Sequence, residues 1–317
     1  MCLLQDRYQR TIRYLRLSVT ELCNYRCQYC MAEEGVPKRA HEDMLSIEEL
    51  AEIGEAAVRC GVTKIRLTGG EPLVRRGVLT LIERLRALDG LRELTMTTNG
   101  SLLENAAIDL KQAGVDRLNI SLDTLSPSKF RTISRRGELA DVLRGLNAAK
   151  AAGFAHTKLN TVLLGGVNDD EIADFVALTR ENDYCVRFIE LMPMGVCANF
   201  PKERFLSAEA VLAAVPELEP IGGDGVAELY RVPGHRGTVG LIRPMSRCFC
   251  ADCDRIRVTA DGKLKPCLHA AAELPLRGLH GVDLENAIRE GAALKPARHH
   301  LASGVSDTPR AMNQIGG

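Results

Sequence analysis

Short β-like runs alternate with helical stretches between Leu15 and Pro193. The six runs are YLRLSVT, KIRLTGG, ELTMTTN, RLNISLD, TKLNTVLL and VRFIELMP, which begin at residues 14, 64, 93, 117, 157 and 186. Six successive strand and helix units favour a parallel sheet with crossover helices, as a partial barrel or as an open doubly wound sheet. The predicted fold class is therefore α/β.

Capping and breaking residues mark the first helix and the end of this alternation. Ser46 and Glu49 have the capping-box spacing before an apolar stretch, and Gly61 provides a stop signal. Beyond Pro193 glycine and proline become frequent, and short strands such as AELYRV and TVGLIR precede a cysteine-rich hairpin and a polar tail. We therefore predict two regions, residues 1–200 and residues 201–317.

The predicted strands are apolar on one face and polar on the other, although buried parallel strands are normally apolar on both. The polar positions are Arg16, Ser18, Thr20, Lys64, Arg66, Thr68, Thr95, Thr97, Asn99, Asn119, Ser121, Asp123, Lys158 and Asn160. If the apolar face packs on helices, the polar face lines a barrel interior, which a closed eight-stranded barrel would fill with apolar side chains. Arg and Lys side chains that converge in such an interior could bind a polyphosphate. The alternative is that the charged side chains nearest the strand ends simply reach solvent.

The composition excludes some classes of partner and compartment. The 317 residues include 41 Lys and Arg and 41 Asp and Glu, so the net charge indicates neither nucleic acid nor a membrane surface. The N-terminal sequence lacks the apolar core of a signal peptide, and no run approaches the roughly 18 apolar residues of a membrane span. We expect a cytoplasmic protein with reduced cysteines, which are metal ligands or redox groups where they cluster and small buried hydrophobes where they do not. The scattered ones are Cys2, Cys60, Cys185 and Cys197.

Cys23, Cys27 and Cys30 form a C-x3-C-x2-C cluster directly after the first predicted strand. A structural zinc site needs four ligands, whereas three thiolates can hold a cubane of four irons and four sulfides that leaves one iron open to a small molecule. Three structural thiols, or a zinc site completed from elsewhere, are the alternatives. This spacing in this position resembles that of the radical S-adenosylmethionine superfamily.

The TGGEP turn at residues 68–72 follows the second predicted strand, where that superfamily places glycines that contact its cofactor. Gly69 and Gly70 allow the backbone to approach a ligand closely. A Gly-Gly-Glu-Pro sequence by itself indicates only a turn. Its position downstream of the cysteine cluster is what favours a role in cofactor binding.

A second cysteine cluster lies in a predicted hairpin. Residues 261–262 are Asp-Gly, which is typical of a tight turn between two alternating runs. Folding about this turn returns Cys267 to Cys253, so that Cys250, Cys253 and Cys267 form a second three-thiolate site. A zinc ribbon-like site with Cys248 as the fourth ligand is the alternative, and the spacing does not decide between the two.

Arg255 and Arg257 stand two residues apart and would point to the same face beside that second site. The two triads, the GGEP turn, the DRIRVTADGKL run and the terminal IGG together resemble the GTP 3′,8-cyclase family, molybdenum cofactor biosynthesis protein A, over essentially the whole chain. The resemblance implies an incomplete (β/α)6 TIM-like barrel with a C-terminal α+β segment that carries a second iron-sulfur site. A terminal Gly-Gly would by itself be a frayed tail, but in the family that end enters the active site.

The same resemblance implies an activity. It is that of a radical S-adenosylmethionine lyase that converts GTP to (8S)-3′,8-cyclo-7,8-dihydroguanosine 5′-triphosphate, the first step of molybdenum cofactor biosynthesis. The cofactors would be two 4Fe-4S clusters and S-adenosylmethionine, whose 5′-deoxyadenosyl radical would take hydrogen from the ribose C3′ of GTP. The partners would be GTP, an electron donor and a downstream cyclic pyranopterin monophosphate synthase, with no nucleic acid or membrane, and a homodimer is left open.

Residue roles follow from the resemblance, position by position. The cluster ligands would be Cys23, Cys27, Cys30, Cys250, Cys253 and Cys267. The S-adenosylmethionine contacts would be Tyr29, Gly70, Ser121 and Met192. The GTP contacts would be Arg16, Arg66, Thr97, Lys158, Arg255, Ile256 and Arg257. The catalytic residues would be Arg255, Arg257, Gly316 and Gly317. Five of these positions also lie on the polar face predicted from strand alternation alone, so two independent arguments agree on Arg16, Arg66, Thr97, Ser121 and Lys158.

Two other functions stay open at this point. A radical S-adenosylmethionine enzyme that modifies a peptide or RNA with an auxiliary cluster shares the first motifs, although the neutral net charge disfavours RNA. A non-catalytic iron-sulfur electron carrier would use complete four-cysteine sites and would need no cationic interior. Cleavage of S-adenosylmethionine by the reduced protein would distinguish an enzyme from an electron carrier.

Overall fold

The computed structural model describes residues 3–36, 40–301 and 306–316. Six parallel strands form its centre, each within the run predicted from the sequence except that the sixth begins one residue earlier. They are β1 (Tyr14–Ser18), β2 (Lys64–Thr68), β3 (Glu93–Thr98), β4 (Arg117–Ser121), β5 (Lys158–Leu163) and β6 (Cys185–Glu190). The predicted parallel α/β sheet is confirmed.

Helices follow most of these strands and form an outer layer. They are α1 (Ile47–Arg59), α2 (Val78–Arg86), α3 (Leu103–Ala113), α4 (Pro127–Ser134), α5 (Leu139–Ala151), α6 (Ile172–Ala177), α7 (Glu209–Ala214), α8 (Gly281–Ala293) and α9 (Met312–Ile315). The capping box of α1 is present, because Ser46 Oγ accepts from the backbone N–H of Glu49 at 3.1 Å and the Glu49 carboxylate accepts from Ser46 N–H at 2.7 Å. Gly61, at φ +107°, then ends the helical backbone as predicted.

The C-terminal region adds strands to both edges of the same sheet. These strands are β7 (Glu219–Asp224), β8 (Ala227–Arg231), β9 (Thr238–Ile242), β10 (Arg255–Val258), β11 (Lys263–Lys265) and β12 (Leu274–Pro275). β9 pairs with β6 and β10 pairs with β1, both in parallel, while the outer pairs are antiparallel. The strand order is therefore β12-β11-β10-β1-β2-β3-β4-β5-β6-β9-β8-β7. Residues 201–317 thus complete the sheet on both sides of the N-terminal region.

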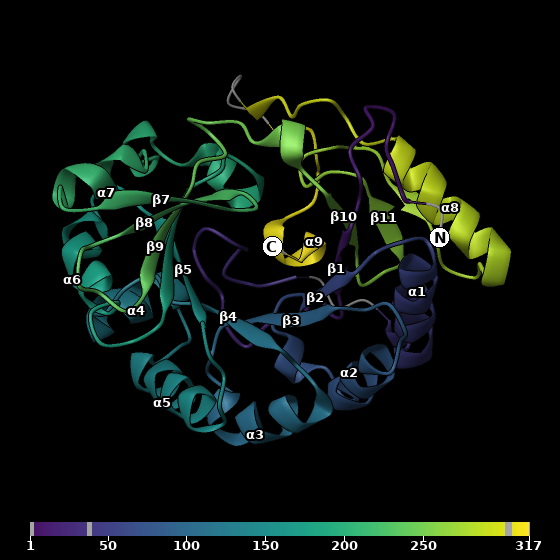
Figure 1. Ribbon diagram of the computed structural model, residues 1–317, viewed down its shortest axis with the longest axis horizontal. Helices are drawn as coiled ribbons and strands as arrows, with labels where there is room; N and C mark the ends of the chain where they lie inside the picture. The colour runs from purple at the N-terminus through teal and green to yellow at the C-terminus, as the bar shows by residue number, and fades with distance from the viewer. Residues whose placement is uncertain (1–2, 37–39, 302–305, 317) are drawn as a thin grey trace.

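The sheet curves, and most of the helices lie on its outer side (Figure 1). The apolar side chains of the strands pack against these helices, so the polar face of the sheet turns inward. Leu15, Leu17, Ile65 and Leu67 are at most 1% exposed and belong to one core with the helices. The short helix α9, near the C-terminus, lies within the ring of strands rather than outside it. Of the predicted polar positions, the interior is lined by Arg16, Arg66, Thr97, Asn99, Asn119, Ser121 and Asn160. Lys64 and Lys158 do not line it and instead pair with Glu93 and Asp224.

Two sequence predictions, on Cys2 and Gly317, fall outside the described residues. Within the described ranges, no helix combines the length and the apolar character that crossing a membrane requires.

Candidate active site

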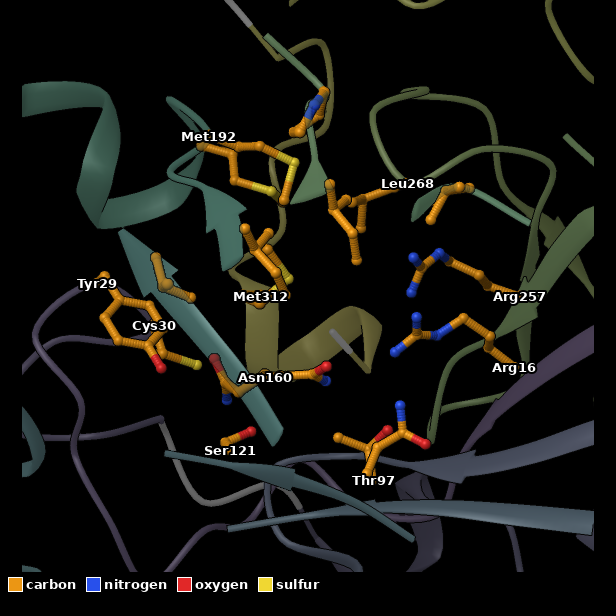
Figure 2. A pocket seen from close by; sticks show the side chains of 18 of the residues that line it. Arg16, Tyr29, Cys30, Thr97, Ser121, Asn160, Met192, Arg257, Leu268 and Met312 are labelled. Carbon is orange, nitrogen blue, oxygen red and sulfur yellow. The ribbon is translucent and has the colours of Figure 1, made fainter. Parts of the chain in front are cut away.

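A cavity of about 300 Å³ occupies the barrel interior, and all six predicted cluster cysteines line it. Figure 2 shows its two sides, with Tyr29 and Cys30 on one and Arg16 and Arg257 on the other. Segments from the two ends of the chain therefore meet at one site.

The first triad lies in the loop that leaves β1. The backbone N–H of Cys30 donates to Cys27 O at 2.9 Å, and Tyr25 N–H donates to Cys23 Sγ at 3.3 Å, so the loop is folded around its sulfurs. Burial, followed by the neighbouring Cys23, raises the pKa of the Cys30 thiol to about 12, and burial likewise raises the pKa of Cys27. Thiolates at these positions therefore need a nearby positive centre.

The arrangement of this triad fits a cluster better than a single ion. Cys23, Cys27 and Cys30 do not come within 4.8 Å of one another as a set of ligand atoms, although all three face the same cavity. One zinc ion requires its ligands to be that close, whereas a cubane places them on separate corners. The donor set thus fits a 4Fe-4S group with one iron left without a protein ligand.

The turn after β2 approaches the first triad closely. A Cβ on Gly70 would lie 2.3 Å from Leu22 O, so only glycine fits there. The buried Glu71 anchors the turn, because its carboxylate accepts from Thr98 Oγ1 at 2.8 Å and from Asn99 N–H at 2.6 Å. Gly70 also lines the cavity.

Tyr29, Ser121 and Met192 lie near Cys30 on the same side of the cavity (Figure 2). The Tyr29 hydroxyl donates to Asp123 Oδ2 at 2.7 Å, which fixes the ring beside the triad. With Gly70, all four predicted S-adenosylmethionine contacts line this cavity together with the first cysteine triad.

The other side of the cavity is cationic. Arg16, Arg66, Arg255 and Arg257 line it, and the guanidinium carbons of Arg66 and Arg255 lie 5.4 and 5.3 Å from the centre of the Tyr14 ring. Burial is the main cause that lowers the pKa of Arg16 and of Arg66 to about 9, yet a guanidinium stays protonated at neutral pH. Positively charged arginines that lie close together and are shielded from water favour the binding of an anionic ligand.

Lys158 and Arg187 are almost fully buried and share one counter-ion. Each forms an ion pair with the carboxylate of Asp224, at the turn between β7 and β8. Arg187 lines the cavity, whereas Lys158, which was predicted to contact GTP, does not. Because Lys158 shares Asp224 with Arg187, it lies beside the cavity wall. Sequence reasoning missed Arg187 because the alternation was not continued into the sixth strand, where Arg187 and Ile189 occupy the polar face.

Several buried polar atoms of the inner face have no hydrogen-bond partner among the described residues. They are Thr97 Oγ1, Asn160 Oδ1, Arg255 Nε and both side-chain amide atoms of Asn119. Buried polar groups are nearly always paired in native proteins. These atoms all belong to residues that line the cavity, so they are available to a polar ligand.

The second triad is held by the predicted hairpin. β10 and β11 pair with Arg257 opposite Lys265, which brings the chain beyond β11 back toward Cys253. The Lys295 ammonium joins the two arms by donating to Arg255 O at 2.8 Å and Pro266 O at 3.0 Å. Although burial opposes it, Lys295 and then Arg255 hold the pKa of the Cys253 thiol below its usual range. Cys250, Cys253 and Cys267 all line the cavity.

The C-terminal tail reaches the same interior. The Arg257 guanidinium donates to Gly316 O at 2.7 Å, and a Cβ on Gly316 would lie 2.2 Å from Thr68 Oγ1. Arg310 anchors this tail with hydrogen bonds of 3.0 Å to both carboxylate oxygens of Asp261. Gly316 therefore lies beside Arg257, although it does not itself line the cavity.

Two residues differ from the sequence interpretation in their side chains. The Ile256 side chain is buried in the hydrophobic core and does not line the cavity, because β10 alternates and its neighbours Arg255 and Arg257 face inward. Cys197, interpreted as a scattered buried thiol, is 1% exposed but lines the cavity, and its Sγ donates to Tyr29 O at 2.9 Å. The loop after β6 brings it there, which its spacing in the sequence did not reveal.

Comparisons with known proteins give a consistent result. The Radical SAM superfamily model matches residues 17–179, and the Molybdenum Cofactor Synthesis C model matches residues 184–301. A GTP 3′,8-cyclase of Peptoclostridium acidaminophilum is 50% identical over 99% of this chain and 98% of its own length, and one of Alkaliphilus metalliredigens is 45% identical over 99% and 100%. The crystal structure of Streptococcus suis SuiB, at 13% identity, covers 96% of this chain and 68% of that chain with a TM-score of 0.62, which shows a shared fold.

Proposed function

Because the chain belongs to the GTP 3′,8-cyclase family, radical S-adenosylmethionine lyases of molybdenum cofactor biosynthesis, we propose that its interior cavity binds GTP between the two cysteine triads. The observation that supports this most directly is that one cavity is lined by both triads and by a group of buried arginines. An electron carrier would not need that cationic interior, and the full-length similarity to GTP 3′,8-cyclases favours GTP over a peptide or RNA as the substrate.

The first triad is assigned to the radical-generating end of the cavity. Cys23, Cys27 and Cys30 would hold a 4Fe-4S cluster, which with S-adenosylmethionine would supply the one-electron chemistry needed to remove a hydrogen atom from the substrate. We assign the binding of S-adenosylmethionine to Tyr29, Gly70, Ser121 and Met192, because these line the cavity beside the triad. The backbone at Gly70 can come close to a ligand, and the Tyr29 ring is held in place by Asp123.

The triphosphate is assigned to the cationic side. Arg16, Arg66 and Arg187 line it, and Lys158, beside the cavity wall, shares the carboxylate of Asp224 with Arg187. Phosphate oxygens accept charge-assisted hydrogen bonds from both Arg and Lys, so a bound triphosphate can replace the Asp224 carboxylate at these two cations. Thr97 Oγ1, buried and without a partner among the described residues, provides a further polar contact.

The guanine is assigned to the neighbourhood of the second triad. Arg255 and Arg257 project there from one face of β10, and arginine can hydrogen-bond to the acceptors of a guanine edge. Cys250, Cys253 and Cys267 are proposed to hold a second 4Fe-4S cluster, since all three face the cavity and, as a set of three, lack the close spacing of a single-ion site. Any contact from Ile256 would come from its backbone.

The tail is assigned a role in holding Arg257. Gly316 O accepts from its guanidinium at 2.7 Å, which orients that side chain within the cavity. We therefore retain Arg255, Arg257 and Gly316 as proposed catalytic residues. Gly317, an electron donor, the downstream cyclic pyranopterin monophosphate synthase and a homodimer stay predictions.

The deciding experiment combines metal analysis with product analysis under anaerobic conditions. After reconstitution with iron and sulfide, two clusters would give about eight irons per chain and one cluster about four. Incubation with GTP labelled with deuterium at C3′ should transfer that deuterium to 5′-deoxyadenosine, as read by mass spectrometry. Retention of the label in a cyclised product would refute hydrogen removal at C3′.

Two cysteine variants then separate the two triads. Cys23→Ala should abolish cleavage of S-adenosylmethionine, because the first cluster would lose a ligand. Cys267→Ala should keep some cleavage while losing conversion of GTP. Equal loss of both activities in the two variants would contradict the separate roles proposed for the triads.

A further inference from the structure

Cys248 and His299 lie beside the second triad and have no role in the function proposed above. Cys248 precedes Cys250 by two residues, in the segment between β9 and β10, and His299 lies in the segment that follows α8. Cys248 Sγ is 3.8 Å from His299 Nε2. The ligand atoms of Cys248, Cys250 and His299 all lie within 4.8 Å of one another, and no other such group of His, Cys, Asp and Glu occurs in the part of the chain that the structure describes.

These separations match a single tetrahedral metal ion. With zinc–sulfur and zinc–nitrogen bonds of about 2.3 and 2.05 Å, two ligand atoms of a tetrahedral site stand about 3.6 to 3.8 Å apart. The 3.8 Å between Cys248 Sγ and His299 Nε2 is already close to that value. The other pairs of ligand atoms are at most 4.8 Å apart, so a movement of about 1 Å by one side chain is enough to bring them to the separation of a tetrahedral site.

The surroundings hold the histidine ring in a defined place. The rings of His299 and His269 pack edge to face with centres 5.3 Å apart, and His269 Nδ1 is 3.0 Å from Ser306 Oγ. A metal on Nε2 leaves the imidazole proton on Nδ1, so the weak contact from Leu301 N–H to that atom, at 3.3 Å, has to open. Two thiolates and one neutral imidazole would then balance the charge of a divalent ion.

We propose that Cys248, Cys250 and His299 bind one zinc ion when the second cluster is absent, with water at the fourth position. Two thiolates and an imidazole are a ligand set that zinc prefers, and three protein ligands leave one coordination position open. The zinc site itself does not depend on the proposed function. One consequence does: if Cys250 is also a ligand of the second cluster, zinc and that cluster exclude each other.

The test uses full-length, reduced protein that has not been reconstituted with iron and sulfide. Cobalt is added anaerobically as the spectroscopic probe, followed by displacement with zinc. We expect one strongly bound ion per chain, sulfur-to-cobalt charge-transfer absorption, and release of about two protons as the two thiols ionise. Absence of a stoichiometric ion in wild-type protein would overturn the proposal.

Variants identify the ligands. Cys248→Ser and His299→Ala should each lose the bound ion, whereas Cys253→Ser is the matched control that removes a neighbouring thiol and should keep it. Loss of the ion in Cys253→Ser, with retention in Cys248→Ser, would show that zinc uses the triad and would overturn the site. Circular dichroism of each variant confirms that a loss is not caused by unfolding, and Cys248→Ala provides a second substitution at the same position.

A competition experiment tests the shared ligand separately. With one equivalent of zinc present, reconstitution of wild-type protein should stop at about four irons per chain, while Cys248→Ser should reach about eight. Full iron content in wild-type protein that still holds its zinc would overturn the exclusion but not the zinc site. Failure of both proteins to exceed about four irons without zinc would instead contradict the second cluster of the proposed function.

Discussion

Replacement of Asp224 by asparagine should weaken the fold and strengthen GTP binding. Asp224 is the counter-ion of both Lys158 and Arg187, whose side chains are only 5% and 6% exposed, while its own side chain is 45% exposed. Partial burial opposes its ionisation, but Arg187 and then Lys158 hold the pKa of Asp224 well below its usual range. The carboxylate is therefore charged at neutral pH and pairs with two cations that we assign to the triphosphate.

The size of both effects follows from the same two contacts. A charge-assisted hydrogen bond contributes about 1.5 to 3 kcal/mol, and the exposure of Asp224 places its two contacts at the lower end. Both cations contact Asp224 Oδ2, so an asparagine oxygen can keep both contacts but without the charge, and we expect a loss of about 2 kcal/mol in the free energy of unfolding. In the proposed binding mode GTP displaces the wild-type carboxylate, so Asp224→Asn should lower the Kd for GTP by about tenfold, which corresponds to about 1.4 kcal/mol.

The assay is calorimetric titration of the protein with GTP and with guanosine, beside unfolding in urea. Guanosine binding should be unchanged, because it carries no phosphate to replace Asp224. Glu209→Gln is the matched control, since Glu209 is an exposed carboxylate that pairs with the buried Arg243, away from Lys158 and Arg187, and neither lines the cavity. Weaker GTP binding in Asp224→Asn than in Glu209→Gln would refute the reasoning and show that Asp224 aligns the two cations for GTP.

Three further predictions concern the interior. Arg66→Ala should weaken GTP binding about tenfold to a hundredfold and barely affect guanosine, as measured by titration, and equal losses for both would indicate a structural role. Burial and then Arg187 lower the pKa of Lys158 to about 8, so the affinity for GTP should fall as the pH rises through 8. Lys158→Arg should abolish this pH dependence, because arginine keeps its proton. In the unfolded chain the Lys158 ammonium keeps its proton up to about pH 10.4, whereas in the folded protein it loses that proton near pH 8. The free energy of unfolding in urea should therefore rise between about pH 8 and 10.4. Gly316→Ala should abolish turnover, because the added Cβ would clash with Thr68, and it should change the melting temperature little. Gly153→Ala is the control and should remain active, because Gly153 has a similar positive φ but open space around it.

Local pattern determined the elements and the chemistry of the site. The alternation along β1 to β5 depends only on the two-residue period of a strand, so it identified the inward face, including Arg16 and Thr97, before any contact was known. Chain neighbours also predicted the first triad, the hairpin at residues 261–262 and the capping box of α1. These features are decided by residues within a few positions of one another.

Only the tertiary structure decided which distant groups meet. The C-terminal strands complete the two edges of the sheet, where β10 pairs with β1 and β9 pairs with β6. This pairing brings the second triad to the cavity of the first. Asp224 pairs with Lys158 across 66 positions, and His299 approaches Cys248 across 51, so no local pattern could reveal either contact. Such contacts arise because burial of the shared core fixes the positions of whole elements, and the side chains at their ends then find partners that the sequence holds far apart.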